Sequence, residues 1–527
     1  MATAKNICPR EDGLDNLGRK EKAWGNVYTK NLHVTGSVEL PADFVNGILA
    51  KKLLPKVTIT TLSGSTVTAT NGTSALNSTE AGSTGEFSFE IPSLGKWTFT
   101  ATKTGAKAFT RSVVVDVTEI KEYKVEIAHG VRYGYRVKKD EGNPYGRVEY
   151  LFDAVGFTPA KMNFNTGAFD YGSWKDKWFV TKNKPCMVKS NGRIDYYLNP
   201  NNYALKENGT ASDVANVNYD GNAMAQIPLV WVSRYERDGY EYEIISDIQY
   251  DDTYKAYAHT RADGTIADYF LYSMFGGSGG TAKMRSISGQ SLAHDLTAEQ
   301  EIAGCKANGD GWFIHTWSQR QLIRTLLVLM GKSTDTQAVF GIGNCRSGSN
   351  ADSMLKTGTL DTKGQFWGTN ANSSSQVKVF HIEKFWGDQW DRTAGLIYNN
   401  GNICVKMTPE GNGYRLNDII GYTNTGVNIT GSNGGYINKG TCTEYGFIQN
   451  TVSGSSTTYY GDGCWFNNGG LRFALCGESA NNASGIGGAF TLNVNNEPSR
   501  ANWNYGCGLS YLIWHSYLMP PIILSHC

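Results

Sequence analysis

The sequence predicts a multidomain, mainly β protein in which a small β-sandwich is followed by a large α+β region. Residues 56–128 hold short strands of alternating apolar and polar residues, divided by Gly, Ser and Asn turns. The chain has 61 Gly, 29 Tyr and 13 Trp but only 13 Pro, a composition typical of β-rich, loop-rich proteins. Convincing helical patterns are confined to two segments between residues 297 and 332, so the large region has few helices.

Chain length and charge limit the kinds of partner that we expect for this protein. At 527 residues, the chain is long enough for about two to four domains. Charged residues make up 18% and the net charge is +1, so no strong field attracts nucleic acid or an anionic membrane. No run approaches the roughly 20 apolar residues that span a bilayer, and no signal-peptide pattern follows the N-terminus. We expect a protein made in the cytoplasm without a signal peptide, with no nucleic-acid partner and no membrane insertion.

The first 55 residues differ from the rest and predict a separate N-terminal segment. The stretch LGRKEKAWGNVYTKNLHVTG (17–36) pairs a polar turn with an alternating, strand-like run. It resembles a segment of tailed-phage tail and fibre proteins that lies near an attachment point. The resemblance implies that residues 1–55 serve attachment or oligomerisation. An ordinary β-hairpin is the alternative.

We interpret residues 56–128 as a rigid spacer. The strands KVTITTL, EFSFEIP and KWTFTATKTG each place apolar residues on one face. The stretch GEFSFEIPSLGKWTFTATKTG resembles the Ig-like or carboxypeptidase-regulatory-like modules that act as spacers. No residue pattern in this unit points to catalysis.

Beyond this unit we expect a connector at 129–160 and one large domain at 161–527. Its first helix begins with a capping box formed by Thr297 and Gln300 and ends at 307–309. Its second covers 318–332, with Gly331 as the C′ residue that ends it. The apolar residues at helical spacing in the second helix predict a single core-facing side: Leu322, Ile323, Leu326, Leu327 and Met330.

Three parts of this region resemble phage tail proteins with a C-type-lectin-like fold, which is shared with the formylglycine-generating-enzyme superfamily. They are AQIPLVWVSRYERDGYEYEIIS with YKAYAHTRADGTIADYFLYSMFGGS, then ANGDGWFIHTWSQRQLIRTLLVLMGKSTDTQAVFGIGN, and finally LRFALCGESANNASGIGGAFTLNVNNEPSRANWNYGCGLSY. The last block (471–511) matches at several positions in order. In relatives diversified by retroelements, this segment is the variable ligand-binding face.

The residues of this last block support a contact surface. Phe490, Leu492 and Val494 alternate with polar residues 491, 493 and 495, which predicts one buried face and one polar face. Asn, Ser and Tyr side chains form an adaptable hydrogen-bonding set. We predict ligand contacts from Trp465, Phe466, Asn467, Asn468, Arg472, Glu478, Asn481, Asn482, Ser484, Ile486, Arg500, Trp503 and Tyr505. For Trp465 and Trp503, a place in the core of the sheet is the alternative.

The sequence offers no firm catalytic or metal motif, and we predict no catalytic residues, no metal and no cofactor. The ten cysteines lack CxxC or zinc spacing and are expected to be free, buried thiols. Cys464 and Cys476 do not match the copper-binding cysteine pair of formylglycine-generating oxidases, and the dispersed histidines show no iron-binding pair. Glycosidase chemistry needs two carboxylates brought together by the fold, which the sequence cannot pair. The candidates are Glu236, Glu241, Asp251 and Asp252.

Two triplets near the end of this block resemble the calcium-binding motifs of lectins. Calcium-dependent lectins read sugars with Glu-Pro-Asn and Trp-Asn-Asp triplets, and NEPSRANWNY holds a comparable order. Here Ser499 replaces the Asn ligand and Tyr505 replaces the Asp, which removes a carboxylate that Ca²⁺ prefers. Calcium-mediated binding is therefore not expected.

The resemblance implies a phage tail adhesin, or receptor-binding protein, carried in the virion tail. Its C-terminal domain would recognise a glycan or protein on the bacterial surface, and its N-terminus would contact other tail or baseplate proteins. Such proteins are commonly homotrimers, in which avidity raises weak affinities. The alternatives are a structural tail or decoration protein without a receptor and a formylglycine-generating-type oxidase.

Overall fold

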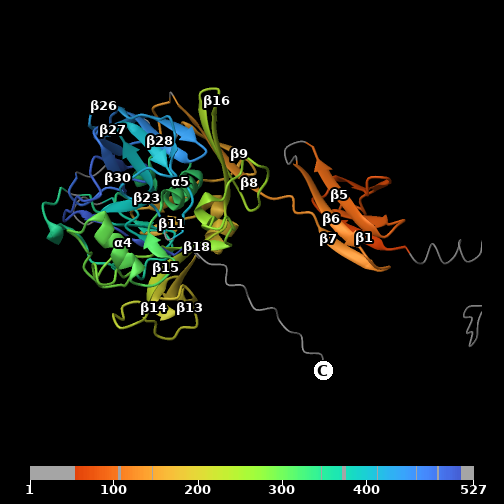
Figure 1. Cartoon of the computed structure of the whole chain (residues 1–527), viewed down its shortest axis with the longest axis horizontal. Helices are drawn as coiled ribbons and strands as arrows, with labels where there is room; N and C mark the ends of the chain where they lie inside the picture. Colours follow the sequence, from red (N-terminus) through yellow and green to blue (C-terminus); the bar gives the residue numbers. More distant parts are fainter. Residues whose placement is uncertain are drawn as a thin grey trace, which may run out of the picture. The chain divides into compact units, whose positions relative to one another are not determined.

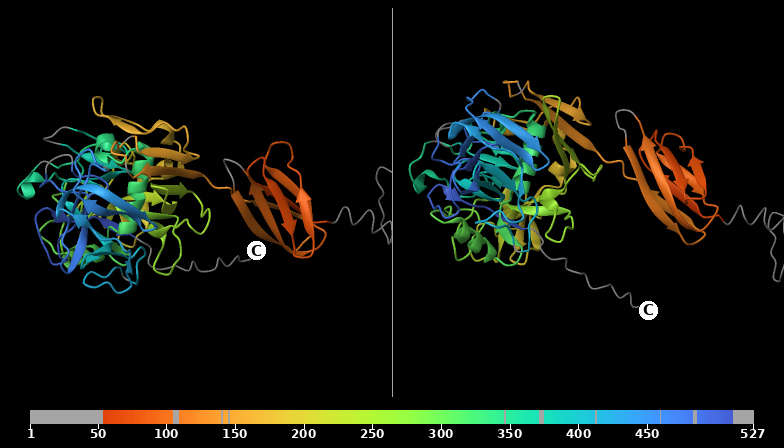
Figure 2. Two further views of the ribbon diagram at one scale, coloured as in Figure 1. Left: turned by 90° about the horizontal axis from the view of Figure 1, so that it is seen from above. Right: turned by 45° about the horizontal axis from the view of Figure 1, so that its top comes forward.

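The computed structural model describes residues 54–511, apart from 105–108, 140, 145, 346, 371–374, 412, 459 and 483–485. The chain forms two compact units, of which the first ends at Ala128 and the second begins at His129 (Figures 1 and 2). The predicted attachment segment lies almost entirely outside the described residues. The mainly β, multidomain architecture expected from the sequence is confirmed.

The small unit is a β-sandwich. Its two sheets have the strand orders β4-β1-β7 and β3-β2-β5-β6. The strands are β1 (Lys56–Thr60), β2 (Thr66–Thr70), β3 (Ala75–Ser78), β4 (Glu86–Glu90), β5 (Gly95–Lys103), β6 (Phe109–Val117) and β7 (Glu122–Glu126). Phe89 of one sheet meets Phe99 of the other edge to face, with ring centroids 5.2 Å apart, and Trp97 is fully buried. The apolar alternation in the sequence therefore builds the interior of the sandwich.

Two large sheets and one smaller sheet form most of the larger unit. A seven-stranded sheet has the order β14-β13-β12-β15-β18-β33-β19. Its strands are β12 (Lys184–Lys189), β13 (Ile194–Asn199), β14 (Asn202–Lys206), β15 (Gly221–Pro228), β18 (Tyr269–Ser273), β19 (Trp312–Ile314) and β33 (Leu509–Tyr511). A four-stranded sheet has the order β16-β17-β8-β9, with β8 (Arg132–Lys138), β9 (Val148–Phe152), β16 (Trp231–Arg237) and β17 (Tyr240–Ser246).

The predicted contact residues lie in the ten-stranded sheet and in the segments between its last strands. Its order is β25-β24-β23-β30-β31-β29-β27-β28-β26, and β32 pairs with β23. Its strands are β23 (Trp390–Asn399), β24 (Asn402–Val405), β25 (Thr423–Asn424), β26 (Thr430–Gly431), β27 (Gly434–Thr443), β28 (Gly446–Val452), β29 (Gly463–Phe466), β30 (Leu471–Cys476), β31 (Leu492–Val494) and β32 (Tyr505–Gly506). Two small sheets pair β10 (Lys161–Asn163) with β11 (Ala168–Asp170), and β20 (Trp367–Gly368) with β21 (Val377–Val379) and β22 (Ile382–Glu383).

The segment 129–160, expected as a connector, contributes two strands to the larger unit. β8 pairs with β17 over seven residue pairs, from Tyr240 opposite Lys138 to Ser246 opposite Arg132, and β9 pairs with β8. The four-stranded sheet thus joins chain segments about 100 residues apart, a pairing that alternation within each segment does not reveal.

The two predicted helices are present. α4 (Ala298–Lys306) has the capping box of Thr297 and Gln300. α5 (Trp317–Gly331) runs through the middle of the larger unit (Figure 1) and is buried on all sides, so the prediction of one core-facing side is wrong. Gly331 is the last residue of the helix, and Lys332 takes the left-handed conformation instead. A Cβ at residue 331 would meet Val339, which favours glycine there. The short helices are α3 (Trp178–Thr181), α6 (Thr336–Phe340), η2 (Gly172–Trp174), η3 (Tyr257–His259) and η4 (Ala351–Ser353).

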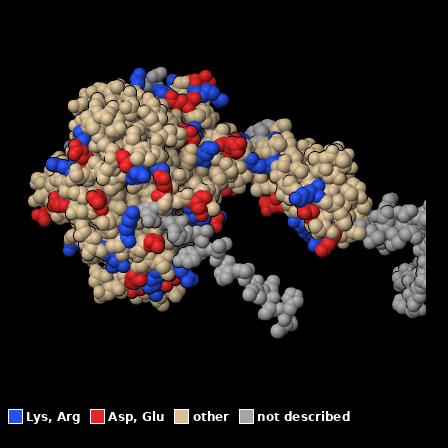
Figure 3. Space-filling model, in the orientation of Figure 1, with Lys and Arg blue, Asp and Glu red and all other residues tan. Residues whose placement is uncertain are grey.

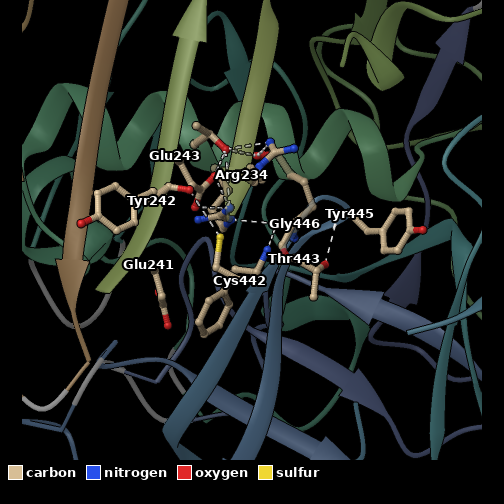
Figure 4. Close-up of polar contacts among 12 residues, drawn as sticks. Arg234, Glu241, Tyr242, Glu243, Cys442, Thr443, Tyr445 and Gly446 are labelled. Carbon is tan, nitrogen blue, oxygen red and sulfur yellow. Dashed lines mark hydrogen bonds and ion pairs between the residues drawn. The ribbon is translucent and has the colours of Figure 1, made fainter. Parts of the chain in front are cut away.

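A buried ionic network fixes α5 against β16 and β17 (Figure 4). Glu243 of β17 contacts Arg234 Nε at 2.9 Å and Arg324 Nη2 of α5 at 2.7 Å. Thr325 also donates a hydrogen bond to this carboxylate. Burial by itself would raise the pKa of Glu243, but the two guanidinium groups lower it to about 2. The carboxylate is therefore ionised and fully paired inside the fold.

The surface carries few charges of either sign. On the face drawn in Figure 3, acidic and basic side chains are interspersed on a mostly uncharged surface. Within the described residues, the helices are too short or too polar to cross a bilayer.

Candidate functional site

The final strands of the ten-stranded sheet position the predicted contact surface. β31 lies between β29, to which it is parallel, and β30, to which it is antiparallel. Phe490, Leu492 and Val494 are buried, as predicted. Thr491 and Asn493 are buried as well, at 2% and 8% exposure, so the expected polar outer face of this strand is absent. Both polar side chains bond within the protein instead: Thr491 Oγ1 accepts from Gly488 N, and Asn493 Oδ1 accepts from Asn495 N.

An open polar hollow lies directly after β31. Its volume is about 500 Å³, and we call it the C-terminal hollow. It is lined by Arg472, Asn495, Asn496, Glu497, Ser499, Arg500 and Ala501. The side chain of Asn493 holds two of these residues, because its oxygen accepts from Asn495 N at 3.0 Å and from Asn496 Nδ2 at 3.3 Å.

The backbone of the hollow is anchored from inside the protein. Ala298 N, at the start of α4, donates to Pro498 O at 2.9 Å. Arg392, which has no exposed surface, donates from Nη2 to Arg500 O at 2.6 Å. The Nε atom of Arg392 lies 2.8 Å from a carboxylate oxygen of Glu301 on α4. The loop is thus held in place while the side chains of Asn495, Ser499 and Arg500 are exposed, which lowers the entropy cost of binding.

The side chains of the hollow carry mixed charge. Arg472 Nη1 lies 2.8 Å from Glu497 Oε1, and the Glu497 side chain is 63% exposed. The Arg472 Nε is buried and has no hydrogen-bond partner among the described residues. Arg500 and Asn495 are exposed. The hollow therefore offers guanidinium and amide donors next to one carboxylate, a set suited to a hydroxyl-, amide- or carboxylate-bearing ligand.

Several predicted residues gather around this hollow. Asn467 and Asn468 are exposed in the loop between β29 and β30, and Arg472 is the second residue of β30. The Asn467 main chain donates to Val494 O, which joins this loop to the end of β31. Tyr398 donates a 2.5 Å hydrogen bond to the side chain of Asn468. These three residues and Arg500 therefore form one polar surface.

Three predicted contact residues are buried, and this corrects the prediction for them. Phe466, Glu478 and Tyr505 have exposures of 2%, 0% and 7%. Tyr505 packs with Trp390 and Leu475 in a small cluster of its own. Burial raises the pKa of Glu478 to about 7. None of the three side chains is open to a ligand, because each faces the interior of the unit.

Other predicted residues lie at the opposite end of β30 from Arg472. Asn481 is exposed and Asn482 is half-buried, with its carbonyl accepting from Ser347 N at 2.8 Å. Ile486 is half-buried, and Ser484 lies outside the described residues. The six residues of β30 span roughly 20 Å, so the structure divides the predicted surface into two parts.

The two tryptophans predicted as contact residues are neither fully buried nor fully exposed. Trp465 is half-buried and packs edge to face on Trp390, with ring centroids 5.4 Å apart. Trp503 is also half-buried. Trp465 therefore supports the sheet while part of its ring is exposed, and Trp503 is also partly exposed.

Sequence reasoning missed five residues of the hollow. They are Asn495, Asn496, Glu497, Ser499 and Ala501. Their signal was present, because a polar stretch with Pro498 directly follows a strand and marks a surface loop.

The structure also contains a Ser-His-Asp arrangement that the sequence did not suggest. Ser273 Oγ lies 3.0 Å from His315 Nε2, and His315 Nδ1 lies 2.7 Å from Asp391 Oδ2. The three residues come from distant segments, and no local motif announces them. Leu509 N donates to Ser273 Oγ at 3.1 Å, and Gly508 packs against the histidine ring.

This arrangement is closed to substrates. The adjoining cavity measures about 30 Å³, which is room for a water molecule and not for an acyl group. Gly508 N donates to Asp391 Oδ1 at 3.0 Å, and Arg320 donates to the other oxygen at 2.8 Å. Burial lowers the pKa of His315, which favours the neutral ring. These contacts hold the segment around Gly508 and Leu509 in the sheet.

The structure also shows how the candidate cysteine pair and the candidate glycosidase carboxylates are arranged. Cys464 and Cys476 both lie opposite Leu492, on either side of β31, and so are roughly 10 Å apart. Glu236 and Glu241 are cross-strand partners, but Glu241 is buried and accepts a hydrogen bond from Tyr460. A substrate cannot reach that second carboxylate.

The described residues also lack a cluster of metal ligands. Among the residues that the structure describes, no three or more His, Cys, Asp or Glu are grouped to hold a metal ion. In the calcium-type triplets, the carboxylate of Glu497 pairs with Arg472, and the amide of buried Asn504 donates to Ser479. The two triplets therefore do not present a shared set of oxygen ligands.

Comparison with known proteins gives a distant structural likeness. No family model matches the chain, and no curated protein matches it. Among solved structures, the Major Tropism Determinant U1 variant is similar to this chain, with 10% sequence identity and a TM-score of 0.23. The similarity covers 63% of this chain and 73% of that one.

Proposed function

We propose that this protein is a phage tail adhesin whose C-terminal hollow binds a ligand on the bacterial surface. The observation that supports this function best is the loop at 495–501, where a backbone anchored by Ala298 and Arg392 carries exposed polar side chains. A rigid scaffold that presents adaptable Asn and Arg side chains is the arrangement expected of a recognition surface. The protein acts by binding and has no catalytic role.

The remaining parts of the chain fit the same proposal. The sandwich at 56–128 is a spacer, and residues 1–55 attach the protein to other tail or baseplate components. The adhesin is a homotrimer in the virion, so that three weak sites act together. Variation generated by a retroelement would fall on 471–511 and change the ligand while leaving the buried strands intact.

A cell-binding assay tests the proposal. Fluorescently labelled full-length protein is incubated with strains that a phage carrying this gene infects and with resistant derivatives, and bound protein is measured by flow cytometry. We expect binding to sensitive strains, and at least a tenfold loss for the double variant Asn495→Ala/Arg500→Ala. The matched control is Asn77→Ala/Arg193→Ala, which removes the same chemistry from two exposed positions elsewhere. Equal binding by both double variants would overturn the assignment of the hollow.

A further inference from the structure

A second cavity lies in the larger unit, lined by residues far in sequence from the C-terminal hollow. Its volume is about 300 Å³, and we call it the tyrosine cavity. Among the residues that line it are Tyr171, Asn183, Tyr197, Asn201, Gln365 and His381. They come from the residue before η2, from the β12–β13–β14 part of the seven-stranded sheet, in which Figure 1 labels β13 and β14, and from the segments around β20–β22.

The wall of this cavity is preformed by a chain of amide hydrogen bonds. Gln365 donates from Nε2 to Asn183 Oδ1 at 2.7 Å and to Val180 O at 3.0 Å, and accepts from Tyr171 Oη at 3.1 Å. Asn183 in turn donates to a backbone carbonyl of β15 at 2.9 Å. Both N–H groups of Gln365 are used inside the protein.

The polar atoms left for a ligand are therefore mostly acceptors. Tyr171 donates its proton to Gln365, and Tyr197 donates its proton to Gln226 at 2.9 Å. Each phenol oxygen keeps lone pairs, as does the side-chain oxygen of Gln365. A ligand rich in hydroxyl donors complements such a wall, whereas a ligand that only accepts hydrogen bonds does not.

The backbone that brings His381 to the cavity has an unusual conformation. Val379 pairs with Ile382, and the two residues between them form the turn, with φ of 51° at Phe380 and 66° at His381. Such turns ordinarily use Asn-Gly, because bulky residues are strained at positive φ. Packing maintains this one: Phe380 meets Phe366 edge to face at 4.8 Å, and His381 Nδ1 lies 2.8 Å from Tyr203 Oη. Strained residues of this kind cluster at ligand sites.

At the rim of the tyrosine cavity, one basic and one acidic side chain lie close together. Lys184 Nζ lies 3.5 Å from a carboxylate oxygen of Glu207 and sits 4.8 Å from the centre of the Tyr197 ring. Burial, with a contribution from the nearby Lys378, lowers the pKa of His381 well below its usual range, so the histidine is neutral. A cavity with no net charge and two half-buried tyrosines suits an uncharged ligand with both apolar and hydroxyl faces.

We propose that the tyrosine cavity binds a neutral sugar, of the size of one monosaccharide unit. A volume of about 300 Å³ is at the small end of ligand pockets. The tyrosines contact the C–H faces of the sugar ring, and the phenol, amide and carboxylate oxygens accept from its hydroxyl groups. This site is separate from the C-terminal hollow and does not depend on the function proposed for it.

Saturation-transfer NMR on the full-length protein tests the proposal. The probes are glucose, galactose, mannose and N-acetylglucosamine, each offered singly, with glucuronic acid as the charged comparison. We expect at least one neutral sugar to bind, and more tightly than glucuronic acid. Thr181→Trp places an indole at the cavity wall and should abolish the signal, whereas Val217→Trp adds the same bulk at a position that is 56% exposed and should not.

A second variant keeps the test decisive if Thr181→Trp does not fold. Asn201→Ala removes an exposed rim amide and should weaken sugar binding several-fold with an unchanged melting temperature. Absence of binding by all four neutral sugars would overturn the proposal. So would sugar binding that neither cavity variant changes.

Discussion

The guanidinium of Arg392 donates from Nη2 to the backbone carbonyl of Arg500 at 2.6 Å, so a fully buried residue holds an exposed one. The same guanidinium contacts Glu301 of α4 at 2.8 Å. The loop that lines the C-terminal hollow is therefore tied to a helix inside the unit. Recognition at the surface should depend on this internal pair.

The first prediction concerns that anchor. Arg392→Gln leaves the Glu301 carboxylate buried without its cation, which should cost about 3–5 kcal/mol of stability. The freed loop at 495–502 should exchange its amide hydrogens faster and bind cells less tightly. Hydrogen exchange and flow cytometry measure both effects. The control is Arg324→Gln, which breaks a different buried pair and should destabilise without weakening binding by the folded protein. Loss of binding by both variants alike would show that stability alone matters.

The second prediction concerns Glu478, whose pKa is raised by burial to about 7. Its unfolded pKa lies near 4.5, so folding favours the protonated form, and the wild type loses stability as pH rises from about 4.5 to 7. Glu478→Gln removes that loss. Urea unfolding should find the variant about 3 kcal/mol more stable than wild type at pH 8, and close to wild type at pH 4.5. A difference that does not change with pH would contradict this account.

The third prediction concerns His259, whose pKa is lowered by burial to about 3. The folded state keeps this ring neutral while the unfolded state binds a proton below about pH 6.5. Stability from this residue is therefore present above pH 6.5 and falls as pH decreases toward 3. His259→Gln keeps an acceptor for Val230 N and cannot titrate. Between pH 6.5 and 5, the wild type should lose about 2 kcal/mol more than the variant in urea unfolding. Equal losses of unfolding free energy in the wild type and the variant would contradict a lowered pKa for His259.

The fourth prediction compares a buried ion pair with an exposed one. Glu243→Gln leaves Arg234 and Arg324 unpaired beside α5 and should cost about 3–5 kcal/mol. Glu149→Gln removes the partner of Arg136 at a site with 31% and 45% exposed side chains, and should cost less than about 1 kcal/mol. Chemical denaturation gives both values. Similar costs for the two variants would mean that the network does not hold the larger unit together.

Local patterns in the sequence predicted the parts of the fold that depend on local interactions. Thr297 and Gln300 cap α4 because a capping box needs only neighbouring residues. The sandwich at 56–128 followed from alternation and turns. The pairing of β8 with β17 was not predicted because it joins residues about 100 positions apart, for which alternation gives no partner.

The candidate site was predicted only in part, because local patterns identify polar residues but do not show which of them the fold buries. Arg472 and Arg500 were recognised as polar residues near the chain end, and both line the hollow. Asn493 was expected at the surface, but it is buried, and its side-chain oxygen accepts a hydrogen bond from the loop at Asn495 N. Glu478 was expected at the surface and is buried. Burial of a polar residue depends on distant strands, which a single sequence does not place.

The most direct test of the central claim is a hydrogen-exchange footprint of the full-length protein on bacterial envelopes. Envelopes from a phage-sensitive strain are compared with those from a resistant derivative that has lost the receptor. We predict slower exchange at 465–472 and 495–503 with the sensitive envelopes alone, and no change at 56–104. Protection confined to the small sandwich, or identical with both envelopes, would contradict recognition by the C-terminal hollow.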